Sequence, residues 1–386
     1  MPLLTRQQSV ETSQYTLGRH DQARARAGLP RPAADLVRRP VTVGTDELRR
    51  FTTDIFVHAG MSDADARVVA AVLVWANLRG VDSHGVLRVP RYVDWIRAGD
   101  VNPAPRLVVT TETAAVVVLD ADRAAGPIAM TAAMGHAVRK AREAGVGLVP
   151  VRGTTHTAAL GYYTLMAARE GMAAIAMAAS TPLMAYHGAR TAGVSTTPIS
   201  IAVPGGADEP LLLDMSTSVV ATGKLLQASK TGEPLPEGAA IDAEGRPTTD
   251  PKKAAVPLPV GGPKGSGLAL MIECLTSLVL ANPIVAEVLE DTAAGRQHRQ
   301  NALVLVLDVA RFGDPAAFRR EIARLIRALK GLPRAAGVDE ILMPGERGNR
   351  THAQRTRDGI PLPPAVVKEL SAVAESLGVK EIPWHA

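Results

Sequence analysis

Cysteine and aromatic residues are scarce in this chain. Cys274 is the single cysteine among 386 residues, so no internal disulfide and no all-cysteine zinc or iron–sulfur site can form. A lone thiol fits a reducing compartment, and we expect a cytoplasmic protein. Phe, Trp and Tyr together supply 3% of the residues, which leaves few rings on which nucleic-acid bases could stack.

Excess charge is confined to the start of the chain. The formal net charge is +5, and residues 1–40 hold seven arginines against three acidic residues, so the remaining sequence is nearly neutral. A nearly neutral body lacks the basic surface that nucleic-acid binding requires. We therefore expect residues 1–40 to form a flexible basic extension and the protein to bind no nucleic acid.

Long hydrophobic runs are also missing. The apolar stretches are interrupted well before the ~20 residues that a membrane-spanning helix needs, and the N-terminus lacks an apolar core of signal-peptide length. We expect no membrane association. Hydrophobic residues make up 46% of the sequence and charged residues 21%, so the chain can bury a large core. Its length indicates two or three domains.

The first third of the sequence is predicted to be mainly helical. Thr45 and Ser62 have the properties of helix N-caps, and Gly60 and Gly80 provide the corresponding helix ends. A third helix is expected around Pro90, which lies either in its first turn or at a kink.

From about residue 106 the pattern becomes that of an α/β protein. Short runs rich in β-branched residues alternate with helices, which is the arrangement of α/β units. The expected strands are 114–120, 147–152, 173–180, 198–204 and 302–309. The expected helices are 131–145, 162–171, one that starts in the glycine-rich segment near 261, one that begins at Asp314-Pro315, and one between Pro363-Pro364 and Gly378. The stretch 231–265 is expected to form long loops.

Reactive side chains are densest in the run RGVDSHGVLRVPRY, residues 79–92. Arg88 and Tyr92 are four residues apart and so share one helix face. The planar guanidinium of Arg88 suits a carboxylate, with which it can form two parallel hydrogen bonds. His84, near a helix N-terminus whose dipole disfavours imidazolium, suits proton exchange with a substrate at neutral pH. The alternative interpretation makes Ser83 a helix cap and makes His84 and Arg88 surface residues.

A serine nucleophile activated by a neighbouring histidine is not expected here. Ser83 and His84 are adjacent, and neighbours one residue apart do not face each other in a helix or a strand. The sequence GVDSHG also differs from the G-x-S-x-G elbow of serine hydrolases.

A second histidine, His156, directly follows an expected strand, where α/β proteins place ligand-binding loops. A lone histidine at such a place is usually structural. Two histidines with Asp214 could also indicate a metal, but no HxH or HxxxH spacing supports one, and we predict no metal site.

A glycine-rich loop, PVGGPKGSG at residues 259–267, leads into an apolar helix. Its glycines permit close backbone approach, the helix N-terminus favours a phosphate, and Lys264 adds a positive charge. The loop matches neither the G-x-G-x-x-G fingerprint nor a Walker loop, so alone it is a weak indication of a nucleotide. A flexible turn with a solvated lysine explains it equally well.

With these motifs in order, the chain resembles the malate/L-lactate dehydrogenase family that is distinct from the Rossmann-fold dehydrogenases. That family includes ureidoglycolate, sulfolactate and 2,3-diketogulonate oxidoreductases and Δ1-piperideine-2-carboxylate reductases. The resemblance runs from about residue 42 to the C-terminus, through RGVDSHGVLRVPRY, AGDVNP, the histidine loop with GYY, LLLDMSTSVVATGK, DAEGRPTTDP, GGPKGSG and MPGER. It implies an α/β, non-Rossmann, sulfolactate-dehydrogenase-like fold. Residues 106–311 would form a cofactor-binding domain with a mixed sheet, and 41–105 with 312–386 a mainly helical domain.

The resemblance also implies a reaction and a set of site residues. Family members transfer hydride between NAD or NADP and a 2-oxo/2-hydroxy or 2-imino/2-amino carboxylate, and they are homodimers with active sites near the interface. By position, the matching catalytic residues are His84 and His156, and the substrate-binding residues are Ser83, Arg88, Tyr92 and Thr197. The matching cofactor-binding residues are Ser180, Asp214, Met215, Ser216, Pro263, Lys264, Gly345 and Glu346.

Three stretches depart from the usual family pattern. The sequences S-N-H-F-G and G-T-N-P are here TTHTA (154–158) and STTP (195–198), so threonine replaces asparagine at Thr155 and Thr197. The usual tryptophan-glycine-glycine is here HGA (187–189). Because an asparagine side chain offers a donor and an acceptor at longer reach than threonine, recognition of substrate or nicotinamide should differ. Both histidines and Arg88 remain, which favours altered specificity and a pathway-specific enzyme.

Two alternatives remain open beside this main hypothesis. The first is a cyclic-imine reductase that acts on Δ1-piperideine- or pyrroline-2-carboxylates, which a comparison of substrates would separate from an oxo-acid dehydrogenase. The second is a degenerate homologue that binds a ligand without redox activity, which would show no affinity for NADH or NADPH.

Overall fold

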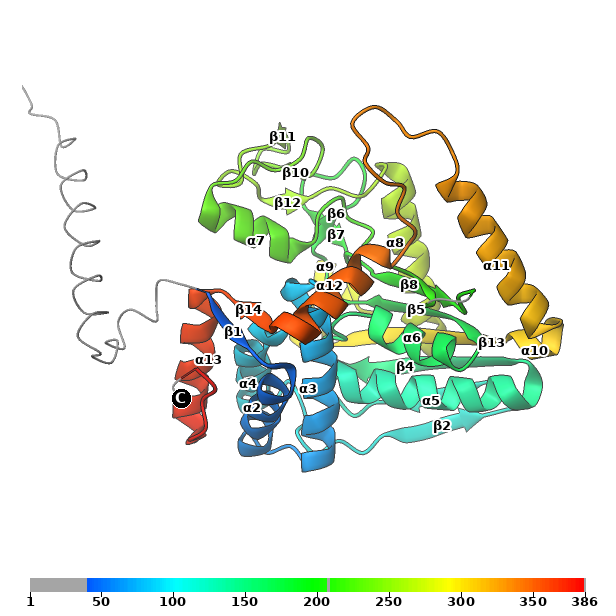
Figure 1. The fold of residues 1–386 in the computed structure, drawn as a ribbon. Helices are drawn as coiled ribbons and strands as arrows, with labels where there is room; N and C mark the ends of the chain where they lie inside the picture. Colours follow the sequence, from blue (N-terminus) through cyan, green and yellow to red (C-terminus); the bar gives the residue numbers. More distant parts are fainter. Residues whose placement is uncertain (1–39, 207–208, 385–386) are drawn as a thin grey trace, which may run out of the picture.

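The computed structural model describes residues 40–206 and 209–384. The predicted basic extension therefore lies outside the described residues, apart from Pro40. Figure 1 shows three groups of elements: a helical cluster, a large sheet with its helices, and a smaller lobe of short strands above the sheet.

The helical cluster joins the first described residues to the last ones. A short antiparallel pair of strands, β1 (Val41–Val43) and β14 (Ile360–Leu362), ties the two ends together. Around this pair lie α2 (Thr45–His58), α3 (Asp63–Leu78), α4 (Val89–Ala98) and α13 (Pro364–Leu377). The predicted cap of α3 is confirmed, because the Ser62 hydroxyl accepts a hydrogen bond from the N–H of Asp65 at 3.1 Å. Pro90 lies in the first turn of α4.

The large sheet has seven strands in the order β2-β3-β4-β13-β5-β8-β9. The only parallel neighbours are β3 and β4, and every other pairing is antiparallel, so the predicted mixed sheet is confirmed. The strands are β2 (Val108–Glu112), β3 (Val117–Asp120), β4 (Val146–Thr154), β5 (Met172–Ala179), β8 (Ile199–Val203), β9 (Leu211–Met215) and β13 (Gln300–Asp308). The five predicted strands are all present, and β2 was not expected from the sequence.

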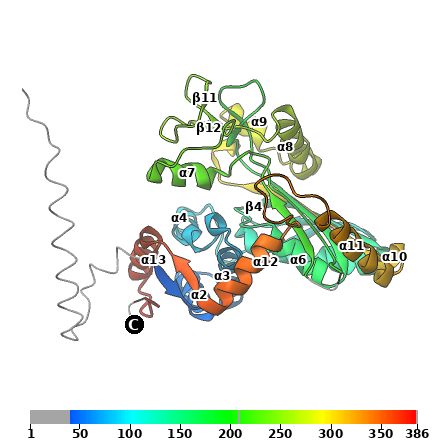
Figure 2. The ribbon, with the colours of Figure 1, turned by 45° about the horizontal axis from the view of Figure 1, so that its top comes forward.

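Helices cover both faces of this sheet. Two of them, α5 (Gly126–Ala144) and α6 (Gly161–Arg169), pack on β4, β13, β5 and β8, and the apolar helix α8 (Pro263–Thr276) contacts β5 and β13. Figure 2 shows α6 and α8 on opposite sides of the sheet. The sheet therefore brings the ends of β4 and β9 and the start of α8 into one region.

The smaller lobe contains the segment that the sequence predicted as loops. Three two-residue strands interrupt it: β10 (Ala240–Ile241), β11 (Pro247–Thr248) and β12 (Val256–Pro257). The remaining elements of this lobe are β6 (Met184–Ala185), β7 (Ala192–Val194), α7 (Thr222–Thr231) and α9 (Val285–Leu289). Most of 231–265 is irregular, as predicted, whereas α7 was not expected.

The C-terminal third contains α10 (Val309–Phe312), α11 (Pro315–Lys330) and α12 (Glu346–Asp358). The predicted start of α11 is confirmed, because the Asp314 carboxylate accepts hydrogen bonds from the N–H groups of Ala316 and Ala317. In Figure 1 this helix lies beside the sheet, far from the helical cluster. The predicted division into a helical domain of 41–105 with 312–386 and a cofactor-binding domain of 106–311 stays a prediction.

One stretch within the described residues, Pro263–Leu280, is long and apolar enough to cross a membrane by length and composition alone. Single stretches of this kind also occur as core helices of globular proteins. Here the stretch carries Lys264 and Glu273, and 39% of it is buried inside the protein. An apolar helix was expected from the sequence here, but with interruptions that would keep it well below membrane-spanning length.

Candidate active site

The segment that was singled out as reactive forms two short 3-10 turns between α3 and α4. The turns span Asp82–His84 and Val86–Arg88, and Gly85 between them is extended. Val86 and Val89 are fully buried and fix the segment to the core. The Arg88 side chain folds back on the same segment, because its Nε donates to the carbonyl of Ser83 at 2.8 Å. Its Nη1 and Nη2 have no hydrogen-bond partner among the described residues, so both can bind a ligand.

The expectation that Ser83 and His84 cannot face each other is wrong. The Ser83 hydroxyl lies 2.9 Å from Nδ1 of His84, within hydrogen-bond distance. The expectation assumed a helix or a strand, whereas a single 3-10 turn followed by an extended glycine allows neighbouring side chains to converge. This bond fixes the His84 ring, and Ser83 remains a candidate substrate-side residue.

The structure brings the two predicted histidines together. His156 follows the end of β4, and its ring stacks on the ring of His84 with 5.5 Å between centroids and an interplanar angle of 19°. The residues lie 72 positions apart in sequence, so only the fold creates this pair. Two adjacent imidazoles suit proton transfer, and the guanidinium of Arg88 suits binding of an anion.

Tyr92 contacts His156 directly. Its hydroxyl lies 2.8 Å from both the carbonyl oxygen and Nδ1 of His156, and the side chain is fully buried. A carbonyl can only accept, so the phenol proton is donated to that oxygen, and Nδ1 of His156 must carry a proton that it donates to the phenol oxygen. Neutral His156 therefore presents the lone pair of Nε2. In this geometry Tyr92 acts on the site through His156.

Both imidazoles are held in the neutral form. Burial, with the nearby positive charge of Arg88 as the second cause, lowers the pKa of His84 to about 4. Burial, followed by the adjacent His84, lowers the pKa of His156 well below its usual range. Burial also raises the pKa of Tyr92, so its phenol stays protonated. At pH 7 both imidazoles are therefore neutral proton acceptors, and Arg88 supplies the positive charge among these three side chains.

The start of α7 closes this site from the opposite side, which the sequence analysis missed. A Cβ atom added at Gly223 would lie 3.1 Å from Cβ of Ser83 and 3.8 Å from Nη2 of Arg88. The first turn of a helix has free N–H groups and a positive end of its dipole. The first turn of α7 and the guanidinium of Arg88 therefore face one region in which a carboxylate would be favoured. The cue in the sequence was the alanine-threonine-glycine run before Lys224.

His298 and Trp95 extend the ring cluster and were also missed. The His298 ring stacks on Trp95 with 3.9 Å between centroids, and Trp95 lies 6.4 Å from His156. Nε2 of His298 is buried and has no hydrogen-bond partner within the described residues. Gln300 pairs with Thr154 across antiparallel strands, so two further residues along that register bring position 298 beside 156. Only the pairing of β13 with β4 reveals this neighbour.

Hydroxyl groups gather where β5 and β9 end and β8 begins. The Ser180 and Ser195 hydroxyls lie 2.9 Å apart, and the Thr197 and Thr217 hydroxyls lie 2.8 Å apart. Thr197 is fully buried, and the N–H of Thr197 donates to the Ser195 hydroxyl at 3.1 Å. The Thr197 side chain is thus committed to internal hydrogen bonds, and the neighbouring Ser216 hydroxyl bonds to Ser218 at 2.9 Å.

The glycine-rich loop adjoins this hydroxyl cluster. Gly261 and Gly262 both have φ near +60°, and the backbone of Gly265 passes so close to Thr217 that an added Cβ would lie 2.8 Å from its carbonyl oxygen. Pro263 occupies the first turn of α8. Lys264 is exposed and has no acidic partner among the described residues, so its ammonium group is available to a ligand.

Asp214 and Met215 are the last two residues of β9 and directly precede Ser216 and Thr217 of the hydroxyl cluster. The backbone of Met215 pairs with Ile199. The Asp214 carboxylate accepts a hydrogen bond from the N–H of Gly161 at 2.8 Å. Part of the Asp214 residue is accessible to solvent. Many protein atoms nevertheless surround the carboxylate, and this partial loss of hydration raises its pKa to about 6. The Gly161 N–H and the positive charge of Arg79 act against that shift.

Gly345 and Glu346 begin α12 and are held by internal contacts. The carbonyl of Gly345 accepts a hydrogen bond from Arg79 at 3.0 Å, and Gly345 has φ of +94°. The Glu346 carboxylate forms an ion pair with Lys330 at 2.7 Å and accepts the N–H of Met343. The Glu346 side chain is therefore committed to the turn that starts α12, and the contact of Gly345 with Arg79 connects this turn to the surroundings of Asp214.

The residues that depart from the usual family pattern are also used internally. The hydroxyls of Thr154 and Thr155 both donate to the carbonyl of Ala124, at 3.3 and 3.1 Å. Ala158 has φ of +55°, a left-handed conformation that glycine adopts without strain. These substitutions alter the backbone contacts around His156, while the side chains of His84, His156 and Arg88 are retained.

Comparison with known proteins places this chain and its fold in a family. A family model described as malate/L-lactate dehydrogenase matches residues 43–371. The chain belongs to this family and is a dehydrogenase.

Relatives within the family carry different names. The chain is 36% identical to a malate dehydrogenase of Pyrococcus horikoshii over 350 residues, which cover 88% of this chain and 96% of the relative. It is 33% identical to the ureidoglycolate dehydrogenase (NAD(+)) of Escherichia coli K12 over 321 residues, with 82% and 91% covered. It is 34% identical to a Δ1-pyrroline-2-carboxylate/Δ1-piperideine-2-carboxylate reductase of Pseudomonas putida, with 88% and 97% covered.

A solved structure of the family has the same fold. The sulfolactate dehydrogenase of Methanocaldococcus jannaschii superposes with a TM-score of 0.79 at 32% identity, and the match covers 88% of this chain and 98% of that protein. The predicted sulfolactate-dehydrogenase-like fold is therefore confirmed.

Proposed function

We propose that this dehydrogenase transfers hydride between NAD or NADP and a 2-oxo/2-hydroxy carboxylate, with a pathway-specific substrate. The observation that carries the proposal is the convergence of His84, His156 and Arg88 opposite the first turn of α7. The paired imidazoles suit proton transfer at the oxygen of C2, and the guanidinium suits the adjacent carboxylate.

The residues on the other side fit a dinucleotide. Phosphate groups favour the N-terminus of a helix, left-handed glycine turns and a free ammonium group, and α8 supplies these with Gly261, Gly262 and Lys264. The hydroxyls of Ser180 and Ser216, the Asp214–Met215 strand end and Pro263 lie next to this loop in the chain or the hydroxyl cluster. The Gly345–Glu346 turn, which contacts Leu212 of the same strand, completes the residues proposed for cofactor binding. A reduced nicotinamide bound there would supply the hydride.

The protein residues would then hold the substrate and move one proton. Arg88 would bind the carboxylate through Nη1 and Nη2 and thereby fix the orientation of C2. In the oxidative direction neutral His84 accepts the hydroxyl proton of the substrate, and neutral His156 accepts a hydrogen bond at Nε2. In the reductive direction His84 must first gain a proton. A substrate carboxylate beside Arg88 offsets the positive charge that lowers the pKa of His84, so substrate binding favours that protonation.

A cyclic-imine substrate is the second candidate, favoured by the identity to the Pseudomonas putida reductase. An imine nitrogen needs the same proton donor and the same carboxylate anchor. The two candidates differ in the shape of the ring that must fit beside Trp95 and His298.

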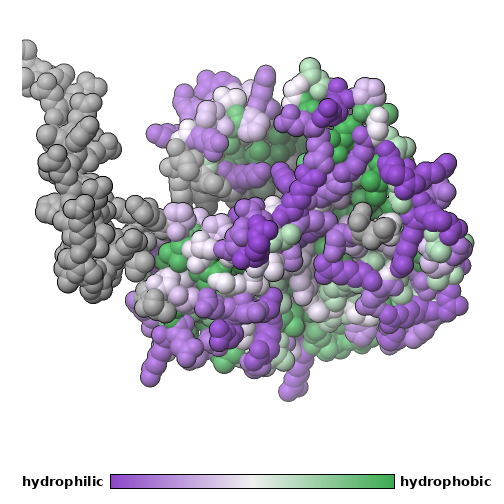
Figure 3. All heavy atoms as spheres, in the orientation of Figure 1, coloured by the Kyte–Doolittle hydropathy of each residue, from purple (hydrophilic) through white to green (hydrophobic). Residues whose placement is uncertain are grey.

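We also propose that the protein is a homodimer in the cytoplasm, with its active site near the interface. Figure 3 shows apolar surface over α8, the helix that begins at Pro263. Six large apolar side chains of this region are 39–65% exposed: Leu268, Leu270, Met271, Leu275, Leu278 and Val279. Apolar surface of this extent favours burial against another chain. Sedimentation of the wild type and of Val279→Lys should give a dimer and a weakened dimer, and a monomeric wild type would contradict the proposal.

The function is tested by following the absorbance of reduced cofactor. The protein is mixed with NADH or NADPH and either a series of 2-oxo acids or Δ1-piperideine-2-carboxylate. Oxidation of cofactor with oxo acids supports the main proposal, and oxidation with the imine alone supports the second candidate. If neither occurs, calorimetry with NADH and NADPH decides, because absence of cofactor binding would show a ligand-binding homologue without redox activity.

A further inference from the structure

The segment that carries Ser83, His84 and Arg88 cannot hold its own position. Its internal backbone hydrogen bonds are those of two single 3-10 turns, His84 N–H to Val81, Gly85 N–H to Asp82 and Arg88 N–H to Gly85. The two turns meet at Gly85, where φ is −92° and ψ is −152°. Because each turn is stabilised by so few bonds, groups outside the segment must set where the imidazole and the guanidinium lie.

Asn77, near the end of α3, makes the first of these contacts. Its Oδ1 accepts the N–H of Val86 at 2.8 Å, and its Nδ2 donates to Oδ1 of Asp82 at 2.6 Å. The side chain is 3% exposed, and a Cβ atom at Gly85 would lie 2.1 Å from its Oδ1. The backbone of the segment therefore runs directly over this amide, and both ends of the amide are used on it.

Arg355, in α12, makes the second contact from 273 residues away in sequence. Its guanidinium donates to both carboxylate oxygens of Asp82, at 2.6 and 3.1 Å, and also to the carbonyl of Asn77. The Arg355 side chain is 17% exposed. A two-pronged contact of this kind fixes direction as well as distance. Figures 1 and 2 both show α12 lying beside α3. The bonds to Asp82 place Arg355 at the start of the reactive segment.

We propose that Arg355 is a positioning residue for the reaction, which acts through Asp82 to set the places of His84 and Arg88. The inference rests on the proposed function for its catalytic meaning. The same helix begins at Gly345, whose carbonyl binds Arg79 beside Asp214. One rigid helix thus connects the region proposed for the cofactor with the segment that carries the proton acceptor, and this gives a polar surface helix a functional role.

The variants are Arg355→Gln, Arg355→Lys and Asp82→Asn, with Arg357→Gln as the matched control. Arg357 lies in the same helix, and its one ion-pair partner among the described residues is the exposed Asp358, at 2.7 Å. We expect Arg355→Gln to lower kcat about 10- to 100-fold, as a small misplacement of reacting groups does, with the KM for reduced cofactor unchanged. The kcat of Arg355→Lys should lie between those of the wild type and Arg355→Gln, because an ammonium group keeps the charge but cannot bridge both carboxylate oxygens. The loss in Arg355→Gln/Asp82→Asn should equal that of the worse single variant.

A second measurement separates positioning from stability and from the proposed function. NMR titration of the His84 ring needs no substrate, and its signal is assigned with His84→Asn. In Arg355→Gln we expect the His84 pKa to rise toward the usual histidine value, because a displaced ring becomes hydrated. The control should titrate like the wild type. If Arg355→Gln does not fold, Arg355→Lys and Asp82→Asn carry the same measurement.

Three outcomes would overturn the proposal. These are a kcat of Arg355→Gln equal to that of the control, a lower kcat with an unchanged His84 titration, and multiplicative losses in the double variant. If the wild type turns over neither oxo acids nor imines, the proposed function fails. The His84 titration still decides whether Arg355 positions this ring.

Discussion

The two sides of the candidate site are built differently. On the histidine side, rings and a guanidinium contact one another within the main core, and Tyr92 and Val86 are fully buried. On the Lys264 side, glycine turns and paired hydroxyls surround an exposed ammonium group and an exposed carboxylate. Proton transfer needs acid–base groups at fixed positions, whereas phosphate binding uses accessible charge and backbone N–H groups. Substitutions on the histidine side should therefore lower activity much more than substitutions on the Lys264 side.

His84→Asn should have the largest effect. Asparagine can keep a hydrogen bond but cannot exchange a proton, so kcat should fall about 10²- to 10⁴-fold. The melting temperature serves as the control, because a structural role would lower it in proportion to activity. In the wild type, kcat for the reductive reaction should fall as pH rises, since His84 must be protonated for it, and this dependence should vanish in the variant.

The same variant tests how burial of His84 affects stability. The folded pKa of about 4 lies below the usual value of 6.5, so the folded protein resists protonation that the unfolded chain accepts. Stability supplied by this group is present above pH 6.5 and is lost as pH falls toward 4, by at most about 3 kcal/mol. The difference in unfolding free energy between wild type and His84→Asn should therefore shrink over this interval. A constant difference would show that His84 is not buried as described.

Arg88→Lys should have the second largest effect. The variant keeps the charge but loses both the planar fork and the bond from Nε to the Ser83 carbonyl. One lost charge-assisted bond lowers kcat/KM about 10- to 100-fold. The exposed Arg91, only three residues away, provides the matched control as Arg91→Lys. Equal effects at both positions would argue against a specific carboxylate contact.

The sequence predicted the histidine side better than its surroundings. Ser83, His84, Arg88 and Tyr92 lie in one short run, so local patterning and the family resemblance were enough to select them. The alternation of β-branched runs with helices likewise predicted five strands of the large sheet, β3, β4, β5, β8 and β13. Residues that are close in sequence, or that alternate along one strand, can be recognised from the sequence, because their spacing is determined locally.

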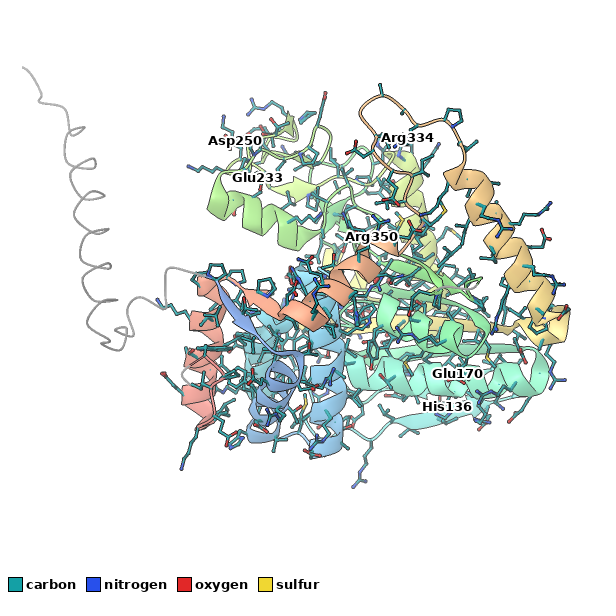
Figure 4. All side chains as sticks on the ribbon, in the orientation of Figure 1. His136, Glu170, Glu233, Asp250, Arg334 and Arg350 are labelled. Carbon is teal, nitrogen blue, oxygen red and sulfur yellow. The ribbon has the colours of Figure 1, made fainter. Side chains whose placement is uncertain are left out.

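What stayed hidden depends on tertiary contacts or on polar helices. The α12 sequence ERGNRTHAQRTRD has no apolar stripe and no buried residue, so periodicity gave no signal for it. Its role depends on ion pairs made along its length, such as that of Arg350 with Glu340 at 2.6 Å, and Figure 4 shows Arg350 on this helix near the centre of the molecule. The stack of His298 on Trp95 likewise forms only once β13 pairs with β4. The tautomer of His156 depends on another tertiary contact, with the Tyr92 hydroxyl of α4.

Lys264→Gln should have a smaller effect, on the cofactor side. The ammonium group is exposed, so its attraction to a phosphate is weakened by water and salt. The KM for reduced cofactor should rise about fivefold at most, and kcat should stay unchanged. The increase should disappear at high ionic strength. Lys252→Gln, at an exposed lysine of the smaller lobe, is the control. A large loss of kcat would contradict the proposed division of roles.

The smallest effect is expected at Ala158, beneath His156. With φ of +55° this alanine pays a steric cost that glycine avoids, and the greater freedom of glycine in the unfolded chain offsets part of the gain. Ala158→Gly should therefore raise the unfolding free energy by about 1 kcal/mol or less, measured by denaturant titration. Gly153→Ala, at φ of +66° in the same strand end, should do the opposite. If both substitutions lower stability, the backbone under His156 is set by packing rather than by its dihedral preference.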